Sequence, residues 1–166
     1  MTLLELVQTK LKSKFGDAII SSEQLYDYPV FTVKRENIID IIHFLYSEPE
    51  LEFQFLTTMC GIHFPDNKGQ ELGVVYHLHN LPQNYRIRLK IFFSVNDAVV
   101  PTLTGLFSTA NWMERETYDF YGIVFKGHPN LKRILNVDDM GGFPMRKEFP
   151  LEDPTRQDKD DKMFGR

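Results

Sequence analysis

Two stretches decide the fold: Glu71-Leu72-Gly73-Val74-Val75-Tyr76-His77-Leu78 and, after a turn, Tyr85-Arg86-Ile87-Arg88-Leu89-Lys90-Ile91. In both, an apolar side chain returns at every second position. This period is typical of a β-strand with one buried face and one solvated face. The five residues between them, Asn80-Leu81-Pro82-Gln83-Asn84, contain turn formers. The sequence therefore predicts an antiparallel hairpin.

Helical periodicity flanks this hairpin on both sides. Thr2 and Glu5 have the spacing of a capping box, and apolar residues then recur every fourth position until Gly16. Residues 36–46 form a second apolar run of helical type, and a third is predicted to open at Pro101 and close at Gly122. Short strands are predicted at 28–33, 53–58 and 123–125. The expected fold class is α+β, with helices packed on one face of a mainly antiparallel sheet.

The chain of 166 residues, 42% of them hydrophobic, is long enough for one core. We predict that this α+β globular domain covers residues 1–137. From Asp138 onward the composition changes: 14 of the last 29 residues are charged, and three prolines interrupt any regular period. Such a segment buries too little apolar area to order alone. Residues 138–166 are therefore predicted to form an extended C-terminal arm that docks on a partner.

Composition also excludes several classes of function. The net charge of −4 argues against nucleic acid as a partner, since such proteins cluster Lys and Arg on one face. Cys60, the single cysteine, excludes an internal disulfide and an iron–sulfur cluster held by this chain alone. No apolar run approaches the roughly 18 residues of a membrane span, so no direct membrane insertion is expected. The single thiol also favours a reducing, intracellular compartment, and no signal or transit peptide is visible.

The predicted third helix carries the most informative polar residues. Trp112, Arg115, Glu116 and Asp119 lie at i, i+3, i+4 and i+7 along one side, whereas Glu114 points elsewhere. Arg115 is spaced to pair with Asp119. These residues form either a partly buried network that orients the strand after the helix or grips a partner, or a solvated helix face with weak surface pairs. Glu116 and Asp119 lack the nucleophile or metal that paired-carboxylate catalysis needs.

Histidines of the hairpin give a weaker signal. His77 and His79 share a strand face and could hold one edge of a metal site, if the fold supplied a third ligand from Cys60, His43 or His63. Satisfied or exposed histidines are the alternative.

A basic row, Arg86, Arg88 and Lys90, runs along one face of the second strand. It is either a water-facing strand side, a nucleic-acid-binding surface, which the acidic net charge disfavours, or a docking surface for an acidic patch of a protein.

One long stretch carries a recognisable signature. It runs Trp112-Met113-Glu114-Arg115-Glu116-Thr117-Tyr118-Asp119-Phe120-Tyr121-Gly122-Ile123, continues with Phe125-Lys126-Gly127-His128-Pro129 and Leu131-Lys132-Arg133-Ile134-Leu135, and ends with Gly142-Phe143-Pro144-Met145-Arg146-Lys147-Glu148-Phe149-Pro150-Leu151. It resembles the signature of the C subunit of the proton-pumping NADH–quinone oxidoreductase, respiratory complex I. The resemblance is dense over residues 111–151 and looser upstream.

The resemblance implies a peripheral-arm subunit with no catalytic, cofactor-binding or metal-binding residues of its own. FMN and the iron–sulfur clusters would sit in partner subunits. The family's C subunit packs on the large D subunit beside the quinone cavity, and its C-terminal arm lies along that partner. The implied location is the cytoplasmic side of a bacterial inner membrane, where the chain is held through its partners.

The resemblance also marks the residues expected to build the structure and the interface. They are Trp112, Glu114, Arg115, Glu116, Asp119, Gly122, His128, Pro129, Arg133, Arg146 and Lys147. Arg115, Glu116 and Asp119 would fix the corner between the third helix and the next strand. His128, Arg133, Arg146 and Lys147 would contact the partner.

Two other interpretations stay open. The chain could be the equivalent subunit of a related membrane-bound hydrogenase or of a ferredoxin- or coenzyme-linked dehydrogenase. A free-standing enzyme is disfavoured because no catalytic triad, metal-ligand set or cofactor loop is visible in the sequence.

Overall fold

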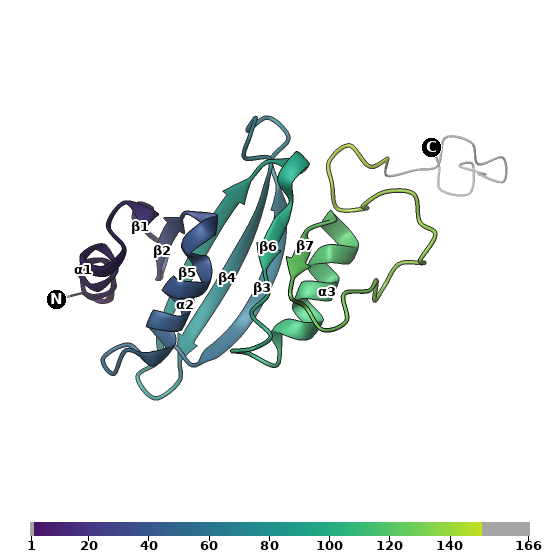
Figure 1. Ribbon diagram of the computed structural model, residues 1–166. Helices are drawn as coiled ribbons and strands as arrows, with labels where there is room; N and C mark the ends of the chain where they lie inside the picture. Colours follow the sequence, from purple (N-terminus) through teal and green to yellow (C-terminus); the bar gives the residue numbers. More distant parts are fainter. Residues whose placement is uncertain (1, 151–166) are drawn as a thin grey trace, which may run out of the picture.

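A five-stranded sheet runs through the middle of the molecule in the computed structural model, which describes residues 2–150 (Figure 1). Its strand order is β1-β2-β5-β4-β3, and β2 runs parallel to β5 while all other neighbours are antiparallel. The strands are β1 (Ile19–Leu25), β2 (Tyr28–Val33), β3 (Phe55–His63), β4 (Leu72–Asn80) and β5 (Tyr85–Phe93). The sheet is thus mainly antiparallel, as predicted.

The predicted hairpin is formed by β4 and β5. Tyr76 lies opposite Leu89 and His77 opposite Arg88, so the apolar residues of both strands share one face. Ile87, Leu89 and Ile91 are buried, whereas Arg86 is exposed. The alternation therefore identifies the core face of both strands. The prediction of a solvated second face is wrong for β4, where Gly73, Val75 and His79 are also buried.

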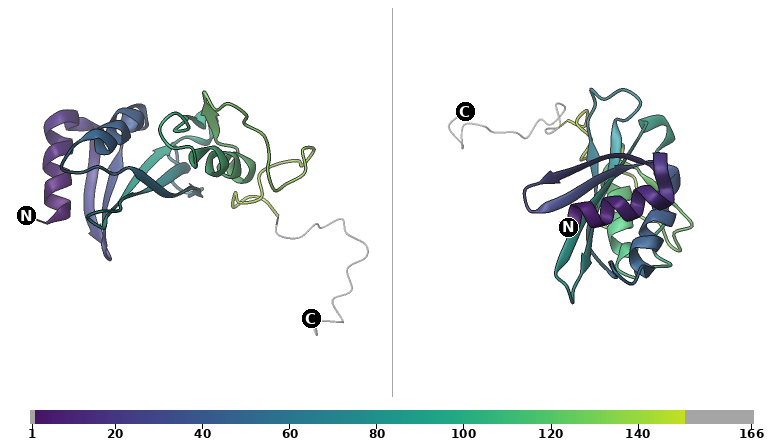
Figure 2. Two further views of the ribbon diagram at one scale, coloured as in Figure 1. Left: turned by 90° about the horizontal axis from the view of Figure 1, so that it is seen from below. Right: turned by 90° about the vertical axis from the view of Figure 1, so that its left-hand side faces the viewer.

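Three helices supply the other half of the core: α1 (Leu3–Phe15), α2 (Ile38–Ser47) and α3 (Ala110–Tyr121). Each contributes buried side chains to the cluster that contains the inward-facing residues of β4 and β5, so the helices cover one face of the sheet (Figure 2). The predicted capping box begins α1: Glu5 N–H donates to Thr2 Oγ1, and Thr2 N–H donates to Glu5 Oε2 at 2.8 Å.

One prediction of secondary structure was wrong, and one strand was missed. The third helix begins at Ala110, not at Pro101, because Pro101 ends a short strand, β6 (Val99–Pro101), that pairs in parallel with β7 (Val124–Lys126). Strand β1 was not predicted at all. Its middle, Ser21-Ser22-Glu23-Gln24, is a largely exposed edge with no apolar alternation.

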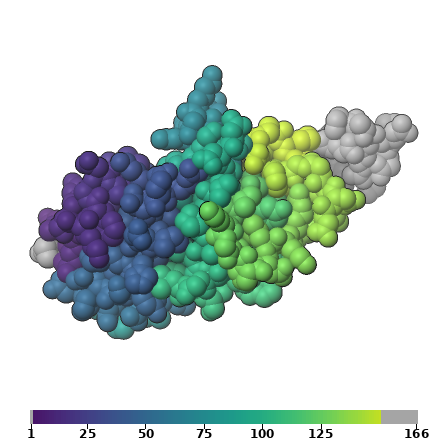
Figure 3. Space-filling view, in the orientation of Figure 1, coloured from purple at the N-terminus to yellow at the C-terminus, as the bar shows by residue number. Residues whose placement is uncertain are grey.

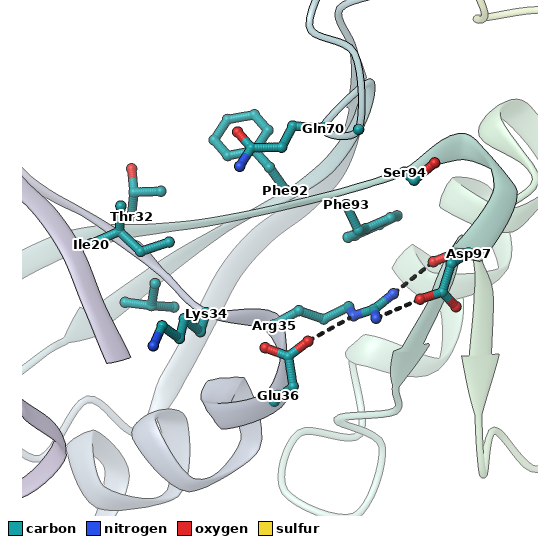
Figure 4. A pocket seen from close by; sticks show the side chains of 12 residues that line it. Ile20, Thr32, Lys34, Arg35, Glu36, Gln70, Phe92, Phe93, Ser94 and Asp97 are labelled. Carbon is teal, nitrogen blue, oxygen red and sulfur yellow. Dashed lines mark hydrogen bonds and ion pairs between the residues drawn. The ribbon is translucent and has the colours of Figure 1, made fainter. Parts of the chain in front are cut away.

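Arg35, in the short 3-10 helix before α2, ties β6 to the sheet. Its guanidinium donates to the backbone oxygens of Asp97 and Val99 and to Asp97 Oδ2, the last at 2.6 Å (Figure 4). Glu36 lies 3.5 Å from the same guanidinium. The cavity of about 390 Å³ beside it is therefore flanked by a cation that is already neutralised within the chain.

Residues 138–150 form neither helix nor strand and lie against the α3 side of the molecule (Figure 3). Met145 N–H donates to the carbonyl of Phe120, and Lys147 N–H donates to His63 Nδ1. The first part of the predicted arm thus contacts the globular body. The rest of the predicted arm, residues 151–166, lies outside the described residues.

Candidate functional site

The C-terminal end of α3 and the loop that follows β7 are joined at Asp119. This carboxylate is fully buried. Its Oδ2 accepts hydrogen bonds from the backbone N–H groups of Ile134, Leu135 and Asn136 at 2.8–3.0 Å. Its Oδ1 accepts from Asn136 Nδ2 and from Arg133 Nη1, both at 3.0 Å. Five donors thus fix one loop on one side chain.

These donors determine the charge state of Asp119. Burial alone would raise the pKa of the carboxyl, but the backbone N–H groups of Asn136, Leu135 and Ile134 and the Asn136 amide hold the pKa well below its usual range. Asp119 is therefore ionised, and its charge is balanced by Arg133. A carboxylate bonded in this way organises structure and is poorly suited to move protons.

The predicted pair of Arg115 with Asp119 is wrong, although their spacing on α3 permits it. Arg115 instead donates through Nε to the carbonyl of Lys132 and through Nη2 to that of Arg133, at 3.2 and 3.1 Å. The partner of Asp119 is Arg133, which comes from the loop. Arg115 and Asp119 thus hold the same loop separately. This loop follows β7, whereas the prediction placed their contacts at the corner between the third helix and the next strand.

Arg133 also reaches beyond the loop. Its Nη2 donates to the carbonyls of Met140 and Gly142 at 3.1 and 3.2 Å, and its guanidinium lies 5.5 Å from the centre of the Phe143 ring. Arg133 therefore connects α3, the loop and the first part of the predicted arm. Its side chain is mostly enclosed by this chain, with 12% of its surface exposed.

Gly122 is where the arm crosses α3. It ends the helix in the left-handed conformation at φ 72°, and its N–H donates to the carbonyl of Tyr118. A Cβ at this position would meet the Phe143 ring at 2.4 Å. The Arg146 guanidinium lies 4.6 Å from the centre of that ring, and its Nε donates to the carbonyl of Tyr121 at 2.8 Å. Glycine is thus needed at position 122 for two reasons: the left-handed backbone that ends α3 and the close approach of Phe143.

Glu114 lies on a different side of α3, as the sequence indicated, and is also fully buried. Its Oε2 accepts from Thr102 Oγ1 at 2.5 Å and its Oε1 accepts from Leu103 N–H at 2.6 Å. Burial raises the pKa of Glu114, against the lowering effect of these two hydrogen bonds and of His128. Glu114 ties α3 to the segment after β6.

His128 has both ring nitrogens engaged. Nδ1 accepts from Asn130 N–H at 3.0 Å, so Nε2 is assigned as the donor to the carbonyl of Asn111, also at 3.0 Å. Pro129 follows it at the surface. The side chain of Lys147 is exposed and has no hydrogen bond or ion pair within residues 2–150. Of the four residues expected to contact a partner, Lys147 alone points freely outward; the other three are engaged within the chain.

The outward surface of this site carries three large apolar side chains among charged ones. Trp112 is 61% exposed and stacks near Arg115, 5.2 Å from its guanidinium, and Glu116 is exposed beside it. Leu135 and Val137, 66% and 65% exposed, flank the loop that Asp119 holds. These two were not predicted as site residues. Their signal is that they are large apolar residues in a segment with no helical or strand period.

The two histidines of β4 each contact a different side chain. His77 Nε2 accepts from Arg88 Nε at 2.7 Å, and His79 Nε2 lies 3.1 Å from Asn84 Oδ1. Within residues 2–150, no three His, Cys, Asp or Glu side chains gather as a metal site would require. No helix in this part of the chain has the length and apolar character needed to cross a membrane.

Comparison with known proteins gives a match that includes the sequence signature and extends upstream of it. Residues 31–155 match the family model described as respiratory-chain NADH dehydrogenase, 30 kDa subunit. The C subunit of NADH-quinone oxidoreductase from Citrifermentans bemidjiense is 40% identical over 150 residues, which are 89% of this chain and 90% of the relative. The C subunit from Streptomyces coelicolor is 44% identical over 121 residues, 73% of this chain, and the match spans about half (48%) of that longer relative.

Solved structures share the fold. A trypsin-resistant fragment of Nqo5 superposes with a TM-score of 0.64 at 29% identity, over 77% of this chain and 98% of the fragment. A chain of an archaeal membrane-bound sulfane sulfur reductase has a TM-score of 0.72 at 22% identity, over 89% of this chain and 85% of its own, a likeness of fold alone. The chain thus belongs to the family of the 30 kDa subunit of respiratory-chain NADH dehydrogenase, also called the C subunit of NADH-quinone oxidoreductase.

Proposed function

We propose that this chain is a non-redox structural subunit of the peripheral arm of NADH–quinone oxidoreductase. It docks on the D subunit beside the quinone site, at the cytoplasmic side of a bacterial inner membrane. Partner subunits pass electrons from NADH through FMN and iron–sulfur clusters to quinone, and this transfer is coupled to proton translocation. The relatives named as subunits of that oxidoreductase, at 40–44% identity, support the proposal.

The observation that carries the proposal is the surface over α3. The loop that presents Leu135 and Val137 is fixed from behind by Asp119 and Arg115. Large apolar side chains on a rigid backbone are suited to docking, because little conformational entropy remains to be lost on association. Trp112 adds an exposed aromatic ring, the residue type most enriched at the energetic centres of interfaces.

The same contacts favour a structural role over a catalytic one. Both carboxylates buried in α3, Glu114 and Asp119, have their oxygens bound by donors of this chain. Because these oxygens are already bound within the chain, neither carboxylate is free to exchange a proton with a substrate. The redox chemistry is therefore assigned to the partners.

Co-purification is the first test. We expect that the tagged full-length chain, captured from detergent-solubilised membranes and analysed by mass spectrometry, brings with it the D subunit and the subunits that bind FMN and NADH. The fold alone does not distinguish this complex from the sulfur reductase type. Recovery with hydrogenase or sulfur reductase subunits, or as a lone monomer, would overturn the proposal.

A second test addresses the apolar surface. Leu135→Asp and Val137→Asp place a charge where both side chains are about two-thirds exposed, so folding should be unaffected. We expect each to reduce the amount of chain recovered in the complex. Ile20→Asp is the matched control, because Ile20 is 59% exposed on β1, away from α3. Equal recovery of all three variants would contradict docking through this surface.

A further inference from the structure

The sheet face opposite the helices contains a small pocket with two arginines in its wall. The pocket has a volume of about 170 Å³ and is lined by residues of β2, β3, β4 and β5. Arg86 and Arg88 enter it from β5, Tyr28 from β2 and His77 from β4. No acidic residue lines it. This pocket is separate from the α3 surface, since none of its residues comes from α3 or from the segment after it.

Arg88 is held in place by its own sheet. Its Nε donates to His77 Nε2 at 2.7 Å, and its guanidinium lies 5.6 Å from the centre of the Tyr28 ring. His77 accepts this bond only while neutral, and burial together with Arg88 lowers the pKa of His77. The two terminal nitrogens of Arg88 make no hydrogen bond within residues 2–150. The guanidinium is thus held in one orientation, while its terminal N–H groups remain available to bind a ligand.

Arg86 has no partner of its own in the described part of the chain. It is exposed, and it makes neither an ion pair nor a hydrogen bond within residues 2–150. Glu23, which faces the same side of the sheet, is paired with Lys90 at 3.6 Å instead. Two guanidinium groups therefore line this pocket, and no carboxylate of residues 2–150 lines it with them.

Exposed apolar side chains surround this end of the sheet. Phe55 on β3 is in register with His79, which is in register with Arg86, so Phe55 is on the same face; it is 42% exposed. The adjoining turns carry Tyr26, 88% exposed, and Leu81. Aromatic residues and arginine are the types enriched at protein–protein interfaces.

We propose that this pocket receives an Asp or Glu side chain from another subunit of the same complex. The inference rests on the proposed function, because it requires such a complex. A planar carboxylate matches the paired donors of a guanidinium and binds it in two-pronged fashion. The net charge of −4 disfavours nucleic acid, and the aromatic surroundings favour a protein over a free anion.

A zero-length cross-link tests the contact directly. Arg86→Lys puts a primary amine at the pocket, and a water-soluble carbodiimide joins an amine only to a carboxylate in contact with it. The reaction is run on the complex purified from membranes, and the linked peptides are read by mass spectrometry. The result expected is an amide between position 86 and an Asp or Glu of a partner subunit. The exposed native amine of Lys12 on α1 measures random coupling.

Several outcomes would overturn the inference. One is an assembled complex in which position 86 is coupled no more than Lys12. Another is coupling only to carboxylates of this chain's own residues 151–166. A third is specific binding of the assembled wild-type complex to vesicles containing phosphatidylglycerol that is lost in Arg86→Glu, which would identify a lipid instead. If the wild-type chain is found in no complex, the proposed function fails, which is a different result.

A charge reversal provides the energetic test. Arg86→Glu should leave the isolated chain as stable as wild type, because Arg86 has no partner within residues 2–150. In the complex we expect about tenfold weaker retention of the subunit during salt washing, since two carboxylates would then face each other. Lys12→Glu makes the same change in net charge on α1 and should leave retention unchanged. Equal retention of the two variants would contradict the inference.

Discussion

The guanidinium of Arg133 donates to the buried carboxylate of Asp119 at 3.0 Å and, from its other side, to the carbonyls of Met140 and Gly142. One ion pair therefore joins α3, the loop at 131–137 and the first residues of the predicted arm. Such a buried charge is stabilising only while all of its partners are present. This dependence makes the site open to direct mutational tests.

Asp119→Asn is expected to destabilise the chain by about 3 kcal/mol. The amide that replaces one oxygen turns N–H donors toward the N–H groups of the loop, and Arg133 loses its counter-charge. Urea unfolding of the isolated chain measures the change. Glu116→Gln is the control: Glu116 is exposed on the same helix and accepts no hydrogen bond from the described residues, so its unfolding free energy should be unchanged. A loss under about 1 kcal/mol for Asp119→Asn would contradict this role.

Asp119 also predicts how stability depends on pH. Its pKa is lower in the folded chain than in the unfolded chain, where it is about 3.9. Its contribution is therefore fully present above that unfolded value and is lost as the pH falls toward the folded value. We expect the wild type to lose stability below about pH 4 more steeply than Asp119→Asn. Parallel curves for the two proteins in acid unfolding would argue against an ionised, hydrogen-bonded Asp119.

Glu114 should behave in the opposite sense. Its pKa is raised in the folded chain, so the folded state binds the proton more tightly than the unfolded state does. Above the unfolded pKa of about 4.3, ionisation of Glu114 lowers stability. Glu114→Gln should therefore gain stability relative to wild type as the pH rises from about 4. Glu114→Ala should cost about 2 kcal/mol, because the Leu103 N–H is left buried without an acceptor. The two variants are compared by urea unfolding across this range.

Gly122→Ala tests the crossing of the arm over α3. Alanine is strained at φ 72°, and its Cβ would meet the Phe143 ring at 2.4 Å. We expect a loss of about 1–2 kcal/mol from the conformation alone, together with release of Phe143 from the helix. Gly141→Ala is the matched control, because nothing lies within 4 Å of its Cβ position. Thermal unfolding measures the losses, and equal values for the two variants would refute the close approach.

The sequence was sufficient where structure depends on neighbours along the chain. The core face of β4 and β5, the capping box of Thr2 and Glu5 and the helix end at Gly122 are local features, and all three are confirmed. Pro101-Thr102 has the residue types of a helix start, but no helix begins there. Thr102 instead donates to Glu114, twelve residues further along, and such a distant contact leaves no local signal in the sequence. Strand β1 is a polar edge and has no periodic signal.

The polar site was only partly predictable for the same reason. From the sequence, a network that includes Arg115 and Asp119 was one of two alternatives, the other being a solvated helix face, and the predicted pair between them does not form. A spacing of four residues on a helix predicts a pair but cannot weigh it against donors from elsewhere. The fold brings Arg133 and the N–H groups of residues 134–136 to Asp119. Together they supply more hydrogen-bond donors than Arg115 alone could.

The most direct test of a docking role compares the amount of complex with its turnover. Arg115→Ala removes the two hydrogen bonds that hold the loop at Lys132 and Arg133. In membranes of a strain carrying this variant, we expect less assembled NADH–quinone oxidoreductase, quantified on native gels, with normal NADH:quinone turnover for each assembled copy. Normal amounts of complex with slower turnover per copy would contradict the account, because they would place this chain in the reaction itself.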